Sequence, residues 1–312
     1  MPDPEQPHVV ILMAVYNGGA YLQEQLDSLA DQAHPDWQLI AGDDGSTDDS
    51  REILDRFARQ HPSIRLDGPG RGGAENFMSL VRRACDHAPP GHWLAFCDQD
   101  DVWLPDRLSR GIAALNATAP DGPALYCSRT WITDDTLGNR RLSAPRPRAP
   151  SFRNALVQNI ASGNTILLNP EAAQLVEAAS RDVERVVVHD WWVYQLVTGA
   201  GGQVVHDDRP TLLYRQHGVN QIGANDTASA RLKRMRQLLR GNFRAWNETN
   251  ARTLSDLQAH LTPENRQALA DFSEMRHGSL PARLAALRRL GPYRQSVAST
   301  LALWVSVLLN RV

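Results

Sequence analysis

Three short polar clusters hold the residues of this 312-residue chain that are best suited to chemistry, and each directly follows an apolar run. Tyr16 and Asn17 follow VVILMAV, Asp43 and Asp44 follow a second run, and the sequence DQDD at 98–101 follows HWLAFC. Apolar runs rich in β-branched residues are typical of strands buried on both faces. The carboxyl ends of parallel strands share one edge of a sheet, where ligands bind. We therefore expect the three clusters to meet at one site.

The third cluster places three carboxylates, Asp98, Asp100 and Asp101, within four residues. Behind a buried strand their mutual repulsion is unfavourable unless a cation or hydrogen-bond donors offset it. Mg²⁺ or Mn²⁺ suits this role, because such ions are held by one or two carboxylates and completed by phosphate oxygens and water. An acidic turn that caps the following helix is an equally good interpretation of this cluster taken alone.

Apolar runs and helically spaced leucines predict the elements that position these clusters. The first hundred residues alternate strands at 9–15, 37–41, 64–66 and 92–97 with helices at 22–29, 48–57 and 74–88. This alternation is typical of an α/β protein with a parallel sheet covered by helices on both faces. Further along the pattern is mixed, with strands expected at 124–132, 165–168, 203–206 and 211–214 and helices at 105–115, 170–179 and 190–198.

The formal net charge of −2 conceals an asymmetry. Lys and Arg number 19 against 30 Asp and Glu in residues 1–230, but 14 against 5 in residues 231–312. We expect a catalytic domain at 1–218, a linker or lid at 219–230 and a basic helical region at 231–312. That region either lies peripherally on an anionic membrane surface or packs on its own domain. Nucleic acid is disfavoured as a partner, because no recognition motif accompanies the charge.

Motifs of several other enzyme classes are missing from the sequence. It contains no GxGxxG after the first strand, no GxxxxGK[ST], no GxSxG and no HExxH, so dehydrogenases, P-loop enzymes, serine hydrolases and zinc proteases lack their motifs. A nucleotidyltransferase would carry a glycine-rich loop with a basic residue after the first strand, and VYNGGAYL has no such residue. Nothing in the sequence selects the paired carboxylates of a glycoside hydrolase. Three cysteines without a CxxC pair and an N-terminus without a signal pattern favour the cytoplasm.

The motifs VYNGGAYLQEQLDSL, DDGSTD and FCDQDDVWLPDRL, in this order and spacing, resemble glycosyltransferase family 2. The likeness continues through ASGNTILLN (161–169), VHDWW (188–192) and YRQHGVNQIG (214–223), and this variant looks most like the bacterial rhamnosyltransferase branch. The resemblance implies a GT-A fold, which is a mixed sheet flanked by helices, here with a C-terminal helical extension. It also implies an inverting transfer of a sugar from a nucleotide-sugar donor.

The resemblance further implies a role for each polar cluster in holding the donor. Asp100 would be the principal ligand of Mg²⁺ or Mn²⁺, Asp98 would contact the metal or the ribose, and His217 would complete the metal site. Asp101 would orient its neighbours. The implied nucleotide pocket is formed by Ala14, Tyr16, Asn17, Asp43, Asp44 and Asp98. Phosphates would be approached by one or more of four arginines: Arg71, Arg82, Arg129 and Arg153.

Asp190 resembles the catalytic base, and the same residue is also well placed by sequence to cap the helix that follows it. Trp191 and Trp192 are interpreted either as core residues or as a wall for the sugar. The branch implies dTDP-L-rhamnose as donor and a glycan or lipid-linked acceptor at the cytoplasmic face of the inner membrane. A UDP-sugar enzyme and a non-catalytic sugar-nucleotide-binding subunit are the alternatives. Residues 138–150, interpreted as a mobile loop, and 218–230 would be either lids or ordinary linkers.

Overall fold

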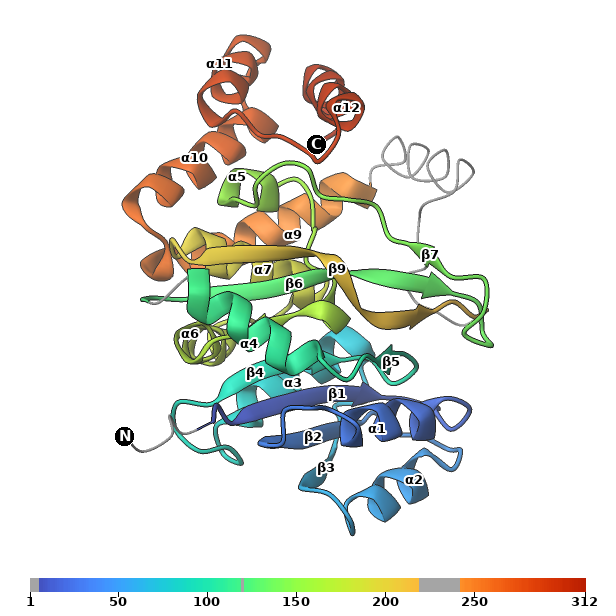
Figure 1. The fold of residues 1–312 in the computed structure, drawn as a ribbon. Helices are drawn as coiled ribbons and strands as arrows, with labels where there is room; N and C mark the ends of the chain where they lie inside the picture. Colours follow the sequence, from blue (N-terminus) through green and yellow to red (C-terminus); the bar gives the residue numbers. More distant parts are fainter. Residues whose placement is uncertain (1–5, 119–120, 219–241) are drawn as a thin grey trace.

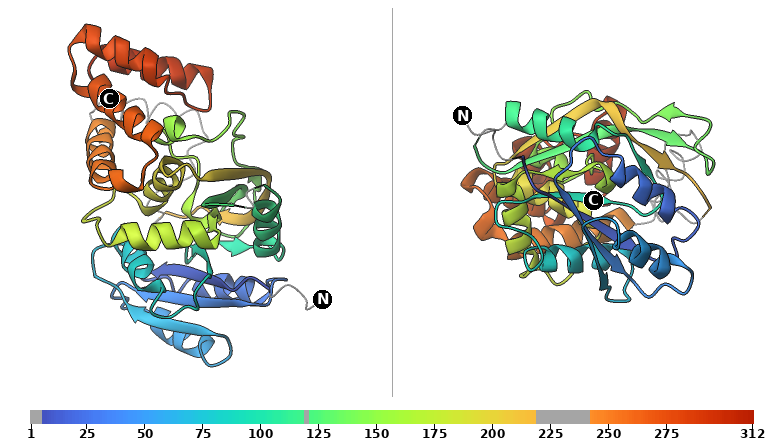
Figure 2. Two further views of the ribbon diagram at one scale, coloured as in Figure 1. Left: turned by 90° about the vertical axis from the view of Figure 1, so that its left-hand side faces the viewer. Right: turned by 60° about the horizontal axis from the view of Figure 1, so that its bottom comes forward.

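The computed structural model describes residues 6–118, 121–218 and 242–312. One nine-stranded sheet runs through the described chain in the order β3-β2-β1-β4-β8-β6-β9-β5, with β7 paired to β6 (Figure 1). Residues 9–97 build one side of this sheet, and residues 102–215 build the other. Helices cover both faces (Figure 2).

The first four long strands are parallel, as the alternating pattern predicts: β1 (Val9–Val15), β2 (Trp37–Asp43), β3 (Ser63–Asp67) and β4 (Trp93–Cys97). Val15 pairs with Asp43 and Met13 pairs with Cys97, so the three strands end at the same edge. Alternate residues of β1 enter two different apolar clusters, one under α1 (Leu22–Ala30) and α2 (Ser50–Phe57), the other under α3 (Gly73–Ala84). Both faces of β1 are therefore buried, which explains its uninterrupted apolar sequence.

The second half of the sheet mixes strand directions, and the purely parallel pattern stops at β4. It contains β5 (Val102–Trp103), β6 (Ala124–Thr133), β7 (Arg141–Leu142), β8 (Leu167–Leu168) and β9 (Gln203–Arg215). β8 runs antiparallel to both β4 and β6, while β9 runs parallel to β6. The prediction of two strands at 203–206 and 211–214 is wrong in one respect. β9 is continuous, because shifts in its register with β6 absorb the polar residues between those two stretches.

The remaining helices of the first 218 residues are α4 (Arg107–Thr118), α5 (Phe152–Ala155), α6 (Pro170–Ser180) and α7 (His189–Gly199), with a 3₁₀ turn at Gly163–Thr165. The start of α6 is fixed by a capping side chain and a proline. The Asn169 side chain accepts a hydrogen bond from the Ala172 N–H at 3.0 Å, and Pro170 occupies the first helical position.

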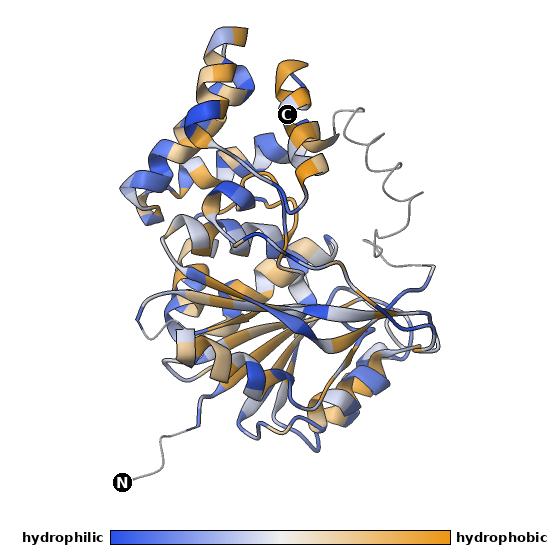
Figure 3. Cartoon of the chain, turned by 45° about the horizontal axis from the view of Figure 1, so that its top comes forward, coloured by the Kyte–Doolittle hydropathy of each residue, from blue (hydrophilic) through white to orange (hydrophobic). Residues whose placement is uncertain are grey.

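The C-terminal part forms α9 (Asn242–Asp256), a 3₁₀ turn at Gln258–His260, α10 (Pro263–His277), α11 (Leu280–Leu290) and α12 (Val297–Leu308). These helices share one apolar cluster with Phe152, Leu156 and Val157, and Figure 3 shows them stacked above the sheet. The predicted linker 219–230 and residues 231–241 of the basic region lie outside the described residues. No helix in the described ranges is long and apolar enough to cross a membrane.

The loop interpreted as mobile, 138–150, is attached to the fold at several points. It contains β7, and the Ser143 N–H donates to the Thr130 carbonyl at 2.9 Å. Further along, the Arg148 N–H donates to Gln295 Oε1 at 3.0 Å, which ties the loop to the segment before α12. The structure therefore shows a connection between the sheet and the C-terminal helices.

A buried ion pair joins the start of β4 to α6, with His92 Nε2 2.7 Å from Glu177 Oε1. Burial alone lowers the pKa of His92, but the hydrogen bond and charge of Glu177 outweigh it and raise that pKa above 6.5. Because folding raises the pKa of His92, the ion pair contributes its full stabilisation at pH values below the pKa that His92 has in the unfolded chain. That contribution is lost as the pH rises through the folded value.

We predict that Glu177→Gln lowers the free energy of unfolding by about 1–3 kcal/mol near pH 6, because the imidazolium loses a charged acceptor. The difference from wild type should shrink near pH 9, where His92 is neutral in both states. Urea unfolding at both pH values measures this. Glu171→Gln, at an exposed position of the same helix, is the control. A loss of the same size at both pH values would contradict the role of the ion pair.

Candidate active site at the carboxyl edge of the sheet

The loops after β1 and β4 are joined by one amide side chain. Gln99 Oε1 accepts the Tyr16 N–H at 2.9 Å, and Gln99 Nε2 donates to the Tyr16 carbonyl at 3.1 Å. A side chain at Gly18 would place its Cβ 2.5 Å from the same Gln99 oxygen, so the two loops touch closely there. The structure thus brings the first and third polar clusters together.

The loops after β1 and β2 are joined in the same way through Asn17, which adopts a left-handed backbone (φ 46°) that asparagine tolerates better than most residues. Its N–H donates to Ser46 Oγ at 2.9 Å, and its side-chain oxygen accepts the Thr47 N–H at 2.8 Å. The neighbouring Gly18 N–H donates to Ser50 Oγ at 2.8 Å. All three predicted clusters therefore meet at one edge, with Tyr16 largely exposed beside them.

The two carboxylates after β2 are buried and already hold protein groups. Asp43 lies 2.5 Å from Arg51 Nε and accepts the Ser46 N–H at 3.2 Å. Burial opposes ionisation of Asp43, but the hydrogen bonds from Ser46 and Arg51 outweigh it and hold the pKa below its usual value. Asp44 accepts the backbone N–H groups of Gly70 and Gly72 at 2.6 and 2.7 Å. Each carboxylate has lone pairs left for a base or ribose, so that role stays a prediction.

The three carboxylates after β4 have three different environments. Asp101 is fully buried and accepts Asn164 Nδ2 at 2.6 Å and the Arg215 N–H at 3.2 Å. Asp100 Oδ2 lies 2.7 Å from His217 Nε2 at the end of β9. Burial, with the charges of Asp100 and Asp190, raises the pKa of Asp98 to about 7. Asp101 is thus held inside the protein, while Asp98 and Asp100 are partly exposed, and the orienting role of Asp101 stays a prediction.

Arg215 ties this acidic loop to its surroundings. Its Nε donates to the Asp100 carbonyl at 2.9 Å, a second nitrogen donates to the Asp135 carbonyl at 2.5 Å, and a third pairs with Glu24 of α1. The guanidinium also lies over the Tyr21 ring, 4.5 Å from its centroid. One side chain therefore sets the relative position of α1, the acidic loop and the end of β9.

Asp190 lies in the first turn of α7 and is fixed by backbone donors. Its two oxygens accept the Trp191 N–H at 2.6 Å and the Gly163 N–H at 3.1 Å. Burial raises the pKa of Asp190 to about 6 in spite of these bonds and one from Asn159. The neighbouring Asn164 side chain binds Asp101, so one turn holds Asp190 beside the DQDD cluster, and the charge of Asp190 adds to the raised pKa of Asp98.

The structure corrects one expectation about Asp190 and decides between the two interpretations of the tryptophans that follow it. The residue that caps α7 is Val188, and Asp190 is not the cap, because the helix already begins at His189. Trp191 and Trp192 are both buried, and Trp191 Nε1 donates to the Ala155 carbonyl at 2.7 Å. The structure therefore places both tryptophans in the core.

Three of the four arginines proposed for phosphate are engaged elsewhere. Arg82 donates to the Ser180 and Val183 carbonyls, Arg129 to the Ser143 carbonyl, and Arg153 to Glu264. Arg71 is exposed and stands between the two glycine N–H groups that Asp44 binds. Ala14, predicted to line the nucleotide pocket, lies next to the end of β1 and packs partly against the core.

The donor set of Asp98, Asp100 and His217 fits a hard divalent cation. No group of three or more His, Cys, Asp or Glu in the described ranges is arranged to enclose a metal ion. Mg²⁺ and Mn²⁺ commonly bind through few protein ligands and take the rest from phosphates and water. Burial, together with the charges of Asp100 and Asp190, raises the pKa of Asp98, and crowded carboxylates of this kind favour a bound cation.

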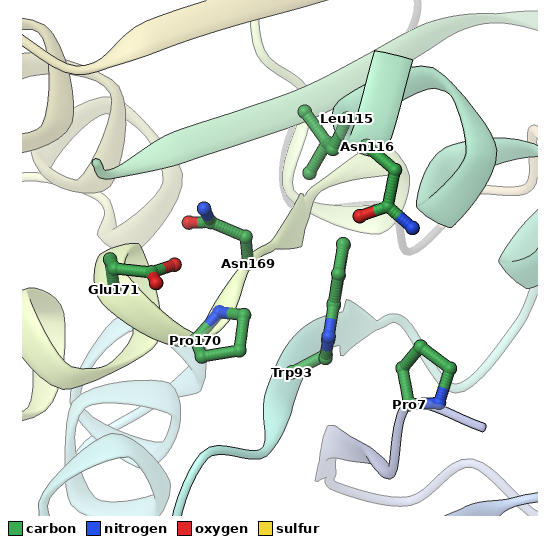
Figure 4. Close-up of a pocket in the computed structure, with 7 residues that line it drawn as sticks. All are labelled: Pro7, Trp93, Leu115, Asn116, Asn169, Pro170 and Glu171. Atoms are coloured by element: carbon green, nitrogen blue, oxygen red, sulfur yellow. The ribbon is translucent and has the colours of Figure 1, made fainter. Parts of the chain in front are cut away.

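A hollow of about 450 Å³ lies at the opposite edge of the sheet (Figure 4). It is lined by Pro7, Trp93, Leu115, Asn116, Asn169, Pro170 and Glu171. The Asn169 side chain is occupied by the N–H groups of Ala124 and Ala172 and by the Gly122 carbonyl. This hollow contains none of the predicted site residues, so the carboxyl edge remains the candidate site.

Comparison with known sequences identifies the family. The sequence pattern of glycosyl transferase family 2 matches residues 10–179, more than half of the chain. The chain belongs to this family. It is 27% identical over 236 residues to the dTDP-rhamnosyl transferase RfbG of Shigella flexneri, a match that covers 72% of this chain and 78% of that protein. It is also 35% identical over 142 residues to an uncharacterized glycosyltransferase of Nostoc sp., covering 44% and 42%.

Comparison with solved structures confirms the predicted GT-A fold of this family 2 glycosyltransferase. S. aureus TarS 1-349 in complex with UDP has a TM-score of 0.55 at 13% identity, covering 97% of this chain and 79% of that one. The complex of TarS with UDP-GlcNAc gives 0.54 at 12% identity, covering 88% and 82%. At such low identity the likeness concerns the fold alone.

The site of this family 2 member includes positioning residues that sequence reasoning missed. Gln99, Asn164 and Arg215 each bind across two segments and stand inside motifs that drew attention for other residues. Their neighbours in DQDD, ASGN and YRQHG were the only signal in the sequence. Asn159 and Glu24 gave no signal at all.

We predict that Arg215→Met lowers the free energy of unfolding by about 1–3 kcal/mol, because it leaves two carbonyls and Glu24 without their donor. It should also weaken nucleotide binding, since the Asp100 loop loses its anchor. Chemical unfolding and calorimetric titration with a nucleoside diphosphate measure the two effects. Arg209→Met, at an exposed position of the same strand, is the control and should change stability by less than about 0.5 kcal/mol. Equal behaviour of the two variants would contradict the positioning role.

Proposed function

We propose that this family 2 member is an inverting, metal-dependent glycosyltransferase that transfers L-rhamnose from dTDP-L-rhamnose. The acceptor is a glycan or a lipid-linked sugar in bacterial cell-surface polysaccharide synthesis, which places the reaction at the cytoplasmic face of the inner membrane. The observation that carries the proposal is the 3₁₀ turn at 163–165, because its Gly163 N–H binds the base candidate Asp190 and its Asn164 side chain binds Asp101 of the DQDD cluster. The similarity to a dTDP-rhamnosyl transferase supports the choice of donor.

Asp190 has the properties that a general base requires. A pKa near 6 leaves it ionised at neutral pH and still able to accept a proton. The Gly163 and Trp191 N–H groups fix its two oxygens, so the carboxylate does not need to reorganise before reaction. In an inverting transfer the acceptor hydroxyl oxygen attacks the anomeric carbon from the face opposite the diphosphate. The hydroxyl proton passes to Asp190.

The other predicted residues would bind the donor. Asp98, Asp100 and His217 would hold Mg²⁺ or Mn²⁺, which when bound neutralises charge on the departing diphosphate. Asp43 and Asp44 would accept hydrogen bonds from the base and ribose. Ala14, Tyr16 and Asn17 would line the pocket around them, and Tyr16, with 58% of its surface exposed, is open to contact from a ligand.

Asp190→Asn tests the base directly. The amide keeps the size of the side chain but cannot accept the proton, so turnover should fall by about 10²–10⁴-fold, while donor affinity stays nearly unchanged. In the wild type, kcat/KM should rise with pH through about 6, as Asp190 ionises. Release of dTDP in the presence of acceptor gives both quantities. Asp182→Asn, at an exposed position after α6, is the control, and retained turnover in Asp190→Asn would refute the assignment.

Asp100→Ala tests the proposed metal site. With the principal ligand gone, the tightening of dTDP binding by Mn²⁺ should fall by roughly tenfold or more, and His217 should lose its hydrogen bond to Asp100. Calorimetric titration with dTDP, with and without Mn²⁺, measures this. Asp86→Ala, which changes an exposed carboxylate outside the site, should behave like wild type. Unchanged metal dependence in Asp100→Ala would remove this residue from the metal site.

A further inference from the structure

No described part of the chain covers the outer side of α12, which is apolar. Its exposed apolar side chains recur at helical spacing and have exposed fractions of 43–74%: Val297, Leu301, Trp304, Val305, Leu308 and Leu309. On the inner side only Leu303 and Val307 are buried, in the C-terminal apolar cluster. Figure 3 shows the hydrophobic character of this helix at one end of the molecule. Single exposed apolar residues are ordinary, but a contiguous stripe of this kind marks an interaction surface.

The charged side chains nearest to α12 in the sequence are all arginines. The helix itself, VASTLALWVSVL, carries no charged side chain. Residues 275–312 contain six arginines and neither aspartate nor glutamate. Arg294 stands just before the helix and Arg311 just after it. An apolar helical face with a tryptophan and flanking cations matches the chemistry of an anionic lipid surface.

The helix is held firmly at its beginning. Tyr293 donates to the Ala149 carbonyl at 2.5 Å and its own carbonyl accepts Asn154 Nδ2 at 2.9 Å. Gln295 accepts the Arg148 N–H, and its N–H donates to Gln158 Oε1 at 2.8 Å. The segment that receives these bonds continues to Gly163, whose N–H binds Asp190. The segment that anchors α12 therefore also carries the N–H group that holds Asp190.

We propose that α12 lies in the interface of an anionic membrane with its outer apolar face among the lipids. A 12-residue helix is about 18 Å long, too short to cross the roughly 30 Å of hydrocarbon, so it lies along the surface. The inference deepens the proposed function, because it brings the site to a lipid-linked acceptor. Binding to lipid does not depend on which sugar is transferred.

A second copy of the chain fits this surface less well than lipid does. Pairing α12 with itself would bring together the arginines that flank the helix in the two copies, the helix itself carries no carboxylate, and like charges across an interface oppose binding. An anionic headgroup region instead attracts each arginine near it. Self-association is therefore the alternative that the experiment must separate from lipid binding.

The test is co-sedimentation of the full chain with vesicles of phosphatidylcholine and phosphatidylglycerol, compared with phosphatidylcholine alone. We expect binding to the anionic vesicles that weakens with added salt. The double variant Leu301→Glu, Leu308→Glu should lower the partition coefficient by roughly tenfold or more, because two exposed apolar contacts become charged. The control pair Ala58→Glu, Gln60→Glu adds the same charge at exposed positions beyond α2, at the other end of the molecule (Figure 1), and should bind like wild type.

Two further measurements make the result unambiguous. Brominated lipid should quench part of the tryptophan emission of the wild type, and Trp304→Phe should remove that part. Sedimentation velocity without lipid reports self-association. Absence of vesicle binding, binding that the double variant retains, or a dimer that the double variant dissociates would overturn the proposal. Any of these results together with intact rhamnosyl transfer would leave the proposed function standing.

Discussion

Several carboxylates are crowded together at the carboxyl edge of the sheet, and the rest of the structure depends on this constraint. Asp98, Asp100, Asp101 and Asp190 stand in or beside a buried region, where each carboxylate opposes the ionisation of its neighbours. The fold meets this cost with donors from segments far apart in the sequence: the 3₁₀ turn, the start of α7 and the end of β9. Burial and the neighbouring carboxylates still raise the pKa of Asp98 to about 7 and hold the pKa of Asp101 well above its usual value.

The arrangement of strands brings hydrogen-bond donors to this cluster. β9 is long enough to cross the sheet and deliver both Arg215 and His217 to the acidic loop. The short antiparallel strand β8 places the preceding turn, with Asn164, against the same loop. The mixed half of the sheet therefore supplies the groups that neutralise a cluster built by the parallel half. It also carries Gly163, which links Asp190 to the segment that anchors α12.

The sequence predicts the parallel half well and the mixed half less well, for physical reasons. β1, β2 and β4 are buried on both faces and appear as apolar runs, so their ends locate the polar clusters. β5, β7 and β8 have two residues each and are too short to show any periodicity. Partners such as Gln99 and Arg215 depend on which strands become neighbours, which a local pattern does not encode. The sequence also predicts Asp190 as a cap of α7, which is wrong because the helix starts one residue before it.

The most direct test of this account is the thermal stability of the purified chain with dTDP, with and without Mn²⁺. Ligand at about 100 times its dissociation constant stabilises a fold by about 2.7 kcal/mol, which is a readable shift. If uncompensated carboxylate charge defines the site, dTDP with Mn²⁺ should raise the unfolding temperature well above either ligand alone, and UDP, GDP and NAD should raise it less. An equal shift without the metal, or no shift with any nucleotide, would contradict the account.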